Sequence, residues 1–498
     1  MAKSKVTLLN MIAGLILQVC AVISGFVVPK IILTYFGSNT NGLIASLGQF
    51  LNYIALIEGG ITSVVTARLY KPLVNSDYNT VSSILVTARN FYRKISIIFI
   101  GYSIILSIAF PLIKHTEFSF IYVFSLSMVL SVGIFIQYMF SLTLKTVLDA
   151  DKKSYIITST QSLIIFLNVV LGIISVNIFP SAHLLKGITA LLFIIQPIVY
   201  GRYVKAHYPI NWLASANNDL IKERWNGFAI NTAAFIHNCT DIAVLTVFTD
   251  LKTVSIYSVY ALVTNGLKQL INSLFSGITP VIGQSYAKED AEELNTKLDV
   301  YEYICFVLVF LAFTLSSLLI TPFVLIYTKN MNDANYNQVI FGVLISVSEA
   351  IYLIKMPHLT LSYTANKFKE ISIHAYIEAG INIVISIILV KSFGLIGVAL
   401  GTITGMLYRM IFHVWFTSRI VENRSQFIFY KKFILFLVTT SVGVLICRAI
   451  TIEIEGIISW ILCGVLYFLV LFILYLVISL LAFRDEMRYI LHYLKKEK

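Results

Sequence analysis

Long apolar stretches, separated by short polar connections, fill this 498-residue chain almost from end to end. Each has about the 20 residues that a helix needs to cross the ~30 Å hydrocarbon core of a bilayer. Barrel strands would instead alternate in polarity over about 10 residues. The pattern therefore predicts an all-α integral membrane protein with about fourteen spans, and twelve or thirteen also fit. They lie at residues 8–34, 41–66, 84–113, 118–144, 155–179, 184–203, 226–248, 254–283, 298–328, 337–364, 370–392, 396–421, 427–450 and 456–482.

Composition agrees with this interpretation. Hydrophobic residues make up 58% of the chain and charged residues 12%, and the mean hydropathy is +0.85. A soluble protein of this length would carry about twice that share of charged residues. The net charge of +12 is spread over short connections. We therefore attribute it to loops that face an anionic leaflet rather than to nucleic-acid binding.

The basic residues fall almost entirely on one set of alternate connections. With a cytoplasmic N-terminus, the outer connections contain few lysines, namely Lys114, Lys186, Lys252, Lys329 and Lys391. The first apolar run is too long for a cleaved signal peptide, so we expect it to span the membrane. The positive-inside rule then predicts a multi-pass membrane protein with both termini in the cytoplasm. The largest loops, about 204–225 and 284–297, are too short for a soluble catalytic domain.

Similar short motifs recur at offsets close to 215 residues. The pairs are EGGITSVV at 58–65 with FSGITPVI at 275–282, LTL at 142–144 with LTL at 359–361, and ADK at 150–152 with ANK at 365–367. Six predicted helices separate the copies, so both copies insert the same way up. We expect two six-helix lobes related by a pseudo-two-fold axis along the membrane normal, an architecture typical of transporters that bind substrate between the lobes.

The repeat suggests domain limits. Residues 1–205 are the predicted N-terminal six-helix lobe, 206–225 a cytoplasmic linker and 226–421 the C-terminal six-helix lobe. Residues 422–498 would add two further spans and a basic cytoplasmic tail.

Ionisable residues within the apolar stretches are candidate functional groups, because a charge in hydrocarbon needs a partner or a wet cavity. They are Lys30, Glu58, Asp241, Lys268, Glu349, Lys355, Glu378 and Arg409. Two helices also carry polar stripes at helical spacing. One stripe is Asn231, Asn238 and Asp241, and the other is Asn265, Lys268, Asn272, Ser276 and Thr279. Such stripes either line a cavity or form hydrogen bonds between helices.

Other features have a structural alternative. Pro29 should kink the first helix beside Lys30, whose ammonium either pairs with Asp241 across the lobe interface or extends to the outer headgroups. Glu58 precedes Gly59-Gly60, where the backbone can bend. Two overlapping G-x-x-x-G units, at Gly397, Gly401 and Gly405, predict close helix packing.

Enzymatic chemistry has little support in the sequence. The five cysteines are scattered singly, the histidines form no metal-binding motif, and there is no Walker motif. We therefore expect a protein that is not an enzyme and has no cofactor or metal.

Several motifs, in this order, resemble those of bacterial polysaccharide flippases of the Wzx type, members of the multidrug/oligosaccharidyl-lipid/polysaccharide (MOP) exporter superfamily. They are LTYFG at 33–37, NGL at 41–43, LIEGG at 56–60, LYKPL at 69–73, LDADKKSY at 148–155, TDI at 240–242, YS at 257–258 and SGIT at 276–279. The resemblance covers roughly residues 8–420.

The resemblance implies a flippase that moves an undecaprenyl-diphosphate-linked oligosaccharide from the inner to the outer leaflet, for capsule or exopolysaccharide synthesis. Its partners would be this lipid-linked substrate, membrane lipids and a polysaccharide polymerase. The first, second, seventh and eighth helices would line a central cavity, with Lys30, Asp241 and Lys268 in it. The last two helices would cradle the polyprenyl tail.

Alternative functions are a lipid II flippase and a cation-coupled multidrug antiporter of the MATE type. Lipid II flippases carry several cavity arginines near the first two helices, whereas this sequence has Lys30 there. A lysine is a point charge rather than a bidentate clamp for a diphosphate, which weakens the lipid II alternative. An antiporter would use carboxylates such as Asp241, Glu58 and Glu378 to cycle protons or sodium.

Overall fold

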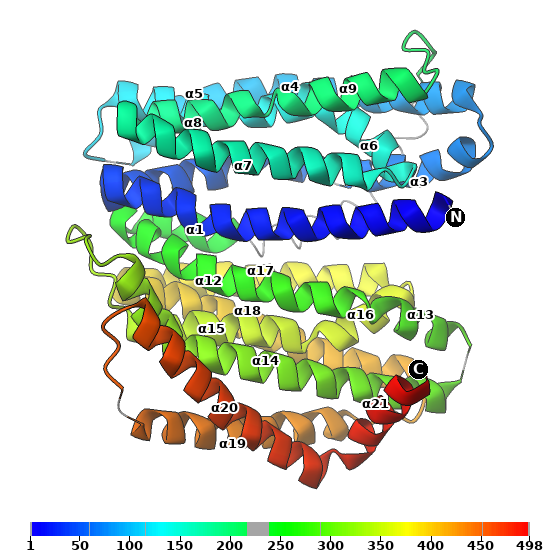
Figure 1. Ribbon diagram of the computed structural model, residues 1–498, viewed down its shortest axis with the longest axis vertical. Helices are drawn as coiled ribbons and strands as arrows, with labels where there is room; N and C mark the ends of the chain where they lie inside the picture. The colour runs from blue at the N-terminus through cyan, green and yellow to red at the C-terminus, as the bar shows by residue number, and fades with distance from the viewer. Residues whose placement is uncertain are drawn as a thin grey trace. The chain divides into compact units, whose positions relative to one another are not determined.

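The computed structural model covers residues 1–498 and is helical without strands in the part of the chain that it describes (Figure 1). That part leaves out Met1, Gly59, His115, residues 217–238, Glu289, Thr451 and residues 497–498. The predicted all-α class is confirmed. The chain forms two compact units, Met1–Val247 and Phe248–Lys498. Residues 239–247 belong to the first unit, whereas the sequence pattern places the seventh helix in the second lobe. The lobe limits drawn from the sequence stay a prediction.

The first unit contains a long initial helix, several short helices and longer helices between them. In order these are α1 (Ala2–Leu51), α2 (Ile54–Glu58), α3 (Ile61–Val74), α4 (Tyr78–Ile113), α5 (Phe120–Ile136), the π-helical turn η1 (Gln137–Ser141), α6 (Leu142–Ala150), α7 (Ser154–Ile178), α8 (Ala182–Leu192), α9 (Ile195–His207) and an apolar helix Cys239–Phe248. Pro29 lies within α1, but the backbone leaves helical geometry at Gly37 (φ 79°, ψ 176°). A positive φ is a conformation that glycine adopts readily, so Gly37 separates the first two predicted spans.

The second unit contains long helices interrupted at defined points. They are α12 (Leu251–Ser276), α13 (Thr279–Ala287), α14 (Ala291–Tyr327), α15 (Val339–Ile354), α16 (Met356–Thr364), α17 (Phe368–Phe393), α18 (Leu395–Ile420), α19 (Gln426–Ala449), α20 (Ile457–Ala482) and α21 (Arg484–Lys496). The loop expected at 284–297 is short, because α13 continues to Ala287 and Asp290 caps α14 through the backbone N–H groups of Glu292 and Glu293.

Eleven helices among the described residues are long and apolar enough to cross a membrane. The first, Lys5–Leu56, contains two predicted spans, since helical hydrogen bonding continues past Gly37. The predicted seventh span falls mostly on residues 217–238, outside the described part. The eighth corresponds to α12, which is not among the eleven because its polar stripe lowers its hydropathy. The protein is therefore a multi-pass membrane protein.

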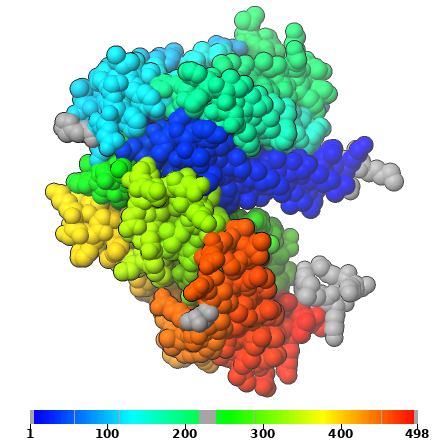
Figure 2. All heavy atoms as spheres, turned by 60° about the vertical axis from the view of Figure 1, so that its left-hand side comes forward, coloured from blue at the N-terminus to red at the C-terminus, as the bar shows by residue number. Residues whose placement is uncertain are grey.

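Exposed apolar side chains show where the helices meet lipid. In the space-filling view the start of α1 forms a rod with its side chains at the surface (Figure 2). Met11 is 63% exposed and Leu15 is 69% exposed. The α20 side chains Ile458 and Leu462 are 72% and 64% exposed. In water such faces would be costly, whereas hydrocarbon tails solvate them.

Each basic connection of the first unit lies at the same end of that unit. Near the start of α1, Asn10 donates to the Lys152 carbonyl between α6 and α7 (3.0 Å), and Ser83 near the start of α4 donates to the Ser215 carbonyl after α9 (2.8 Å). At the opposite end, Asn39 donates to Glu117 (2.6 Å). The helix order within the unit therefore agrees with the alternation on which the positive-inside argument rests.

The internal repeat has a counterpart in backbone detail. Asp77 caps α4 and Asp290 caps α14, 213 residues later. Lys152 before α7 and Asn366 before α17 both have positive φ, 61° and 56°. These two residues are 214 positions apart, whereas the ADK and ANK motifs are 215 apart. The matching turn geometry therefore aligns the two halves one position differently from the sequence motifs.

Close packing at the G-x-x-x-G units is confirmed. A Cβ at Gly397 would lie 2.5 Å from the Leu389 carbonyl oxygen, and one at Gly405 would lie 3.0 Å from the Glu378 carbonyl oxygen. Only hydrogen side chains let α17 and α18 approach this closely.

Candidate functional site

The best-defined group of polar side chains lies within the second unit, where α12 meets α15. Asp250 starts α12 by accepting the Thr253 N–H (2.7 Å), which fixes where the helix and its polar stripe begin. About five turns on, the Lys268 ammonium lies 3.0 Å from Oε1 of Glu349 on α15. The two side chains are 14% and 17% exposed. The pair is therefore largely, but not fully, removed from solvent.

An aromatic ring joins this pair to a second lysine. Tyr352 follows Glu349 by three positions and so occupies the same face of α15. The Lys268 ammonium lies 5.2 Å from the Tyr352 ring centroid, and the Lys355 ammonium lies 4.0 Å from it. Lys355 is 3% exposed and also donates to the Met406 sulfur (3.4 Å). Both ammonium groups are thus stabilised by the negative face of one ring.

A buried ion pair extends the group to α17 and α18. Arg409 donates to Oε2 of Glu378 (2.6 Å) and, through Nε, to Nε2 of His413 (2.9 Å). The charges of Glu378, Arg409, Glu349 and Lys268 all act on Lys355. We refer to Lys268, Glu349, Lys355, Glu378 and Arg409 as the charged network. It combines three basic side chains with two carboxylates, and each carboxylate has a basic partner within it.

The polar stripe of α12 surrounds this network unevenly. Asn265 is exposed, whereas Asn272 is half-buried. The Asn272 side-chain oxygen is buried and, within the described residues, has no hydrogen-bond partner. An unsatisfied buried amide is costly, so this oxygen is an open acceptor for a hydrogen-bond donor.

In the first unit, Glu58 lies in a cluster of hydroxyls. Tyr138 donates to its carboxylate (2.9 Å), as does Thr62, and the Thr62 hydroxyl also pairs with Tyr92 (2.7 Å). These groups join the end of α2 to α3, α4 and η1. The cluster holds Glu58 next to Gly60, whose φ of 83° marks the break between α2 and α3.

The other sequence candidates lie in the first unit or outside the described residues. Lys30 on α1 and Asp241 on the Cys239–Phe248 helix are both half-buried, and each interacts with other groups. Their mutual pairing stays a prediction. Asn231 and Asn238 fall within residues 217–238 and so lie outside the described part.

Sequence reasoning overlooked Tyr352, although the Glu349–Tyr352–Lys355 spacing of three residues was a usable signal. It also overlooked a second buried cluster, next to the first, in which His358, three residues after Lys355, lies 3.3 Å from Glu302. There Glu302 accepts from Arg424, and Lys432 lies 2.8 Å from Asp299 and 3.3 Å from Glu302. Arg424 and Lys432 appear in the sequence as ordinary loop cations, so nothing in their pattern indicates burial.

Within the described part of the chain, no group of three or more His, Cys, Asp or Glu side chains forms a candidate metal site.

No family model matches the sequence. An uncharacterized membrane protein of Methanocaldococcus jannaschii is 34% identical over 94 residues, which are 19% of this chain and 18% of that protein. The chain thus matches under a fifth of that relative's length.

Solved structures match over most of the chain. Lipid II flippase MurJ, in an inward closed conformation, has a TM-score of 0.70 at 15% identity and covers 93% of this chain and 98% of its own. An inward-facing multidrug resistance MATE transporter of the MOP superfamily has a TM-score of 0.62 at 14% identity, covering 84% and 96%. A eukaryotic MATE transporter has a TM-score of 0.60 at 13% identity, covering 85% and 97%. The chain therefore has the fold that lipid II flippase MurJ shares with the MATE transporters.

Proposed function

We propose that this protein is a MOP-type flippase that moves an undecaprenyl-diphosphate-linked oligosaccharide from the inner to the outer leaflet of a bacterial plasma membrane. The MurJ fold supports a lipid-linked cargo, and the motif order supports the polysaccharide branch of the superfamily. The observation that carries the proposal is the partly exposed Lys268 side chain on the polar stripe of α12, with its ammonium 3.0 Å from Glu349.

The chemistry of the Lys268 ammonium suits reversible binding of a diphosphate. Its ammonium has three donors, and Glu349 engages one of them. A phosphate oxygen can accept from another while the ion pair stays formed. Because Lys268 is a compact point charge rather than a bidentate fork, it neutralises the headgroup without clamping it. Lys30 would supply a second cation.

Neutral amides would recognise the sugar. Asn272 offers an unsatisfied buried oxygen, and Asn265 on the same stripe is exposed. Asn231, Asn238 and Asp241 would add further polar groups. Breaks at Gly60 and at Gly277–Ile278, one in each unit, would let helices bend during alternating access.

The test is the leaflet distribution of lipid-linked oligosaccharide in cells depleted of the protein. We expect the diphosphate-linked unit to accumulate on the inner leaflet, with rescue by wild type and by Lys252→Ala but not by Lys268→Ala. Lys252 is a matched control, since it is the other lysine of α12 and lies at its start. Equal rescue by both variants, at equal membrane abundance, would reject the role of Lys268. Accumulation of lipid II instead would identify the protein as a lipid II flippase.

A cation-coupled antiporter is the second candidate, because the MATE transporters share the fold. Such a protein must protonate or metallate a carboxylate in each cycle. Here Oε1 of Glu349 is paired with Lys268 and Oε2 of Glu378 with Arg409, so each carboxylate of the charged network has a basic partner that favours its ionised form. Drug resistance on overexpression, with normal lipid distribution on depletion, would favour the antiporter.

A further inference from the structure

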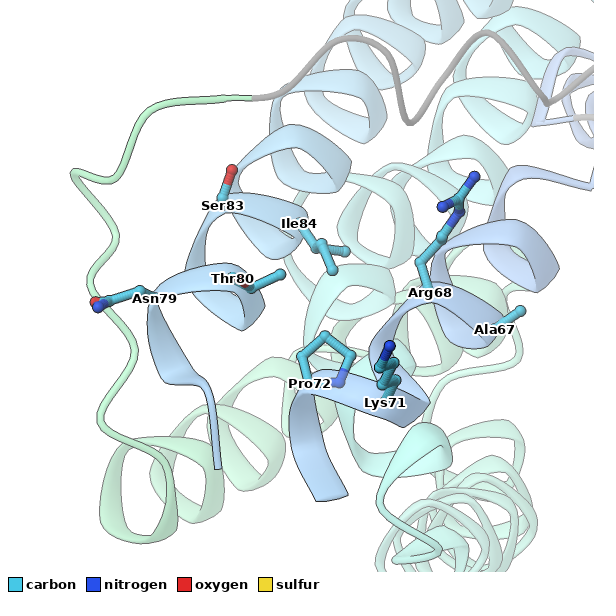
Figure 3. Close-up of a pocket in the computed structure, with 8 residues that line it drawn as sticks. All are labelled: Ala67, Arg68, Lys71, Pro72, Asn79, Thr80, Ser83 and Ile84. Atoms are coloured by element: carbon cyan, nitrogen blue, oxygen red, sulfur yellow. The ribbon is translucent and has the colours of Figure 1, made fainter. Parts of the chain in front are cut away.

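A basic pocket opens at the end of the first unit where α3 ends and α4 begins (Figure 3). Its volume is about 580 Å³. Residues of the two helices line it, namely Ala67, Arg68, Lys71, Pro72, Asn79, Thr80, Ser83 and Ile84. Among the described residues that line it are two cations, Arg68 and Lys71, and no carboxylate, which favours an anion as ligand.

The cations come from one helix and the neutral groups from the next. Arg68 and Lys71 are three positions apart on α3, so they share a face. Figure 3 shows both side chains on the α3 wall, opposite Thr80, Ser83 and Ile84 of α4. Asp77, the nearest carboxylate along the chain, is not in the lining and accepts the Thr80 N–H (3.1 Å).

Neighbouring segments hold this pocket in shape. Ser83 donates to the Ser215 carbonyl (2.8 Å), and the Asn211 N–H donates to the Ser82 hydroxyl (2.9 Å). Arg89 donates to the Trp212 carbonyl (2.9 Å), with its guanidinium 5.0 Å from the Trp212 ring centroid. The chain after α9 is thereby fixed against the start of α4, which forms one wall of the pocket.

The surroundings of the pocket suit a lipid rather than a soluble anion. Tyr70 and Val74, on the same helix as the two cations, are 51% and 84% exposed. Pro72 and Ile84 add apolar surface inside the lining. The pocket also lies at the end of the unit that carries its basic connections, which the positive-inside rule assigns to the cytoplasm. A phosphate headgroup and the first part of an apolar tail would both find a matching surface.

We propose that this pocket is an initial docking site for the diphosphate of a polyprenyl-diphosphate lipid at the inner leaflet. The identity of the lipid rests on the proposed function, whereas the phosphate chemistry rests on the lining. Arg68 presents a planar fork that suits bidentate contact with phosphate oxygens, and Lys71 adds a point charge. A diphosphate carries more charge than the phosphodiester of an ordinary phospholipid and should therefore bind more tightly.

The experiment measures binding of radiolabelled undecaprenyl diphosphate to the full chain in nanodiscs of phosphatidylcholine. The test variant is Arg68→Gln with Lys71→Gln. The matched control is Arg93→Gln with Lys94→Gln, which removes the same charge from exposed positions of α4 outside the pocket. Because Arg68 and Lys71 are also exposed, we expect both variants to fold. We expect affinity to fall at least about tenfold in the test variant and to change little in the control.

Competitors separate the sources of phosphate. Inorganic diphosphate should displace the radiolabelled lipid from the wild-type protein but not from the test variant. Phosphatidylglycerol at the same concentration should compete weakly, and equal competition would replace the proposal with a general anionic-lipid site. Unchanged affinity in the test variant, or equal losses in both variants, would overturn it. The binding assay does not depend on transport. Selective diphosphate binding would therefore support the proposed docking site even if the leaflet assay rejected the flippase function.

Discussion

Lys268 and Glu349 are 81 residues apart in the sequence, yet they form a 3.0 Å ion pair inside the second unit. The pair places a cation on the polar face of α12 while Glu349 limits its charge. The pair stabilises the packing of α12 against α15, and the proposed function gives Lys268 a second role as a cation for phosphate.

A double-mutant cycle at this pair should separate the two roles. Lys268→Gln and Glu349→Gln each leave a mostly buried charge without its partner, so we expect each to cost about 1–3 kcal/mol of unfolding free energy. The double variant should recover most of that loss in thermal unfolding, but it should not restore export, because the cation is gone. Recovery of export by the double variant would show that Lys268 acts only in packing.

The Glu378–Arg409 pair should be more sensitive than the first, since the two side chains are only 3% and 10% exposed. Removing either partner of a buried pair costs about 3–5 kcal/mol. We expect Glu378→Gln and Arg409→Gln to lower the melting temperature strongly, whereas Glu378→Met with Arg409→Met should be nearly neutral. If that double variant still exports lipid-linked oligosaccharide, Glu378 has no role in ion coupling.

Gly401 should tolerate no side chain. A Cβ there would overlap the Ser386 side chain and lie 2.8 Å from the Ser386 backbone nitrogen. Gly401→Ala should force α17 and α18 apart and lower the free energy of unfolding by about 1–3 kcal/mol, measured by thermal unfolding in detergent. Gly380→Ala is the control, because nothing lies within 4 Å of its added Cβ, and alanine there should be neutral or stabilising. Similar losses in both variants would contradict the packing account.

The Arg424–Glu302 pair should anchor the C-terminal helices. The Glu302 side chain is fully buried, and both Arg424 and Lys432 form ion pairs with it and with Asp299. Lys432 also lies 3.6 Å from Glu486 of α21. Arg424→Gln should therefore cost about 3 kcal/mol or more and expose α19 and α21 to limited proteolysis. Arg419→Gln, whose guanidinium lies 4.2 Å from the Trp415 ring centroid, should have a much smaller effect. Equal proteolysis of both variants would argue against the anchor.

The break in the first helix illustrates a limit of sequence reasoning. Proline kinks helices, so a kink was expected at Pro29 and stays a prediction there, whereas the backbone departs from helical dihedral angles at Gly37, which the sequence analysis did not single out. A proline can remain within a helix when its lost hydrogen bond is tolerated, whereas a glycine with φ of 79° cannot be part of one.

The sequence by itself determined the membrane-spanning class, nearly all the helix positions, the close packing at Gly397, Gly401 and Gly405, and the presence of charges within helices. These follow from local hydropathy and residue size, which are properties of short segments. Only the tertiary structure decided which charges meet. Lys268 pairs with Glu349, Arg409 pairs with Glu378, and Arg424 pairs with Glu302 in the protein interior. Such pairing depends on contacts between helices that are far apart in the chain, so the sequence pattern does not show it. The pocket around Arg68 and Lys71 was decided in the same way, since its opposite wall comes from the next helix.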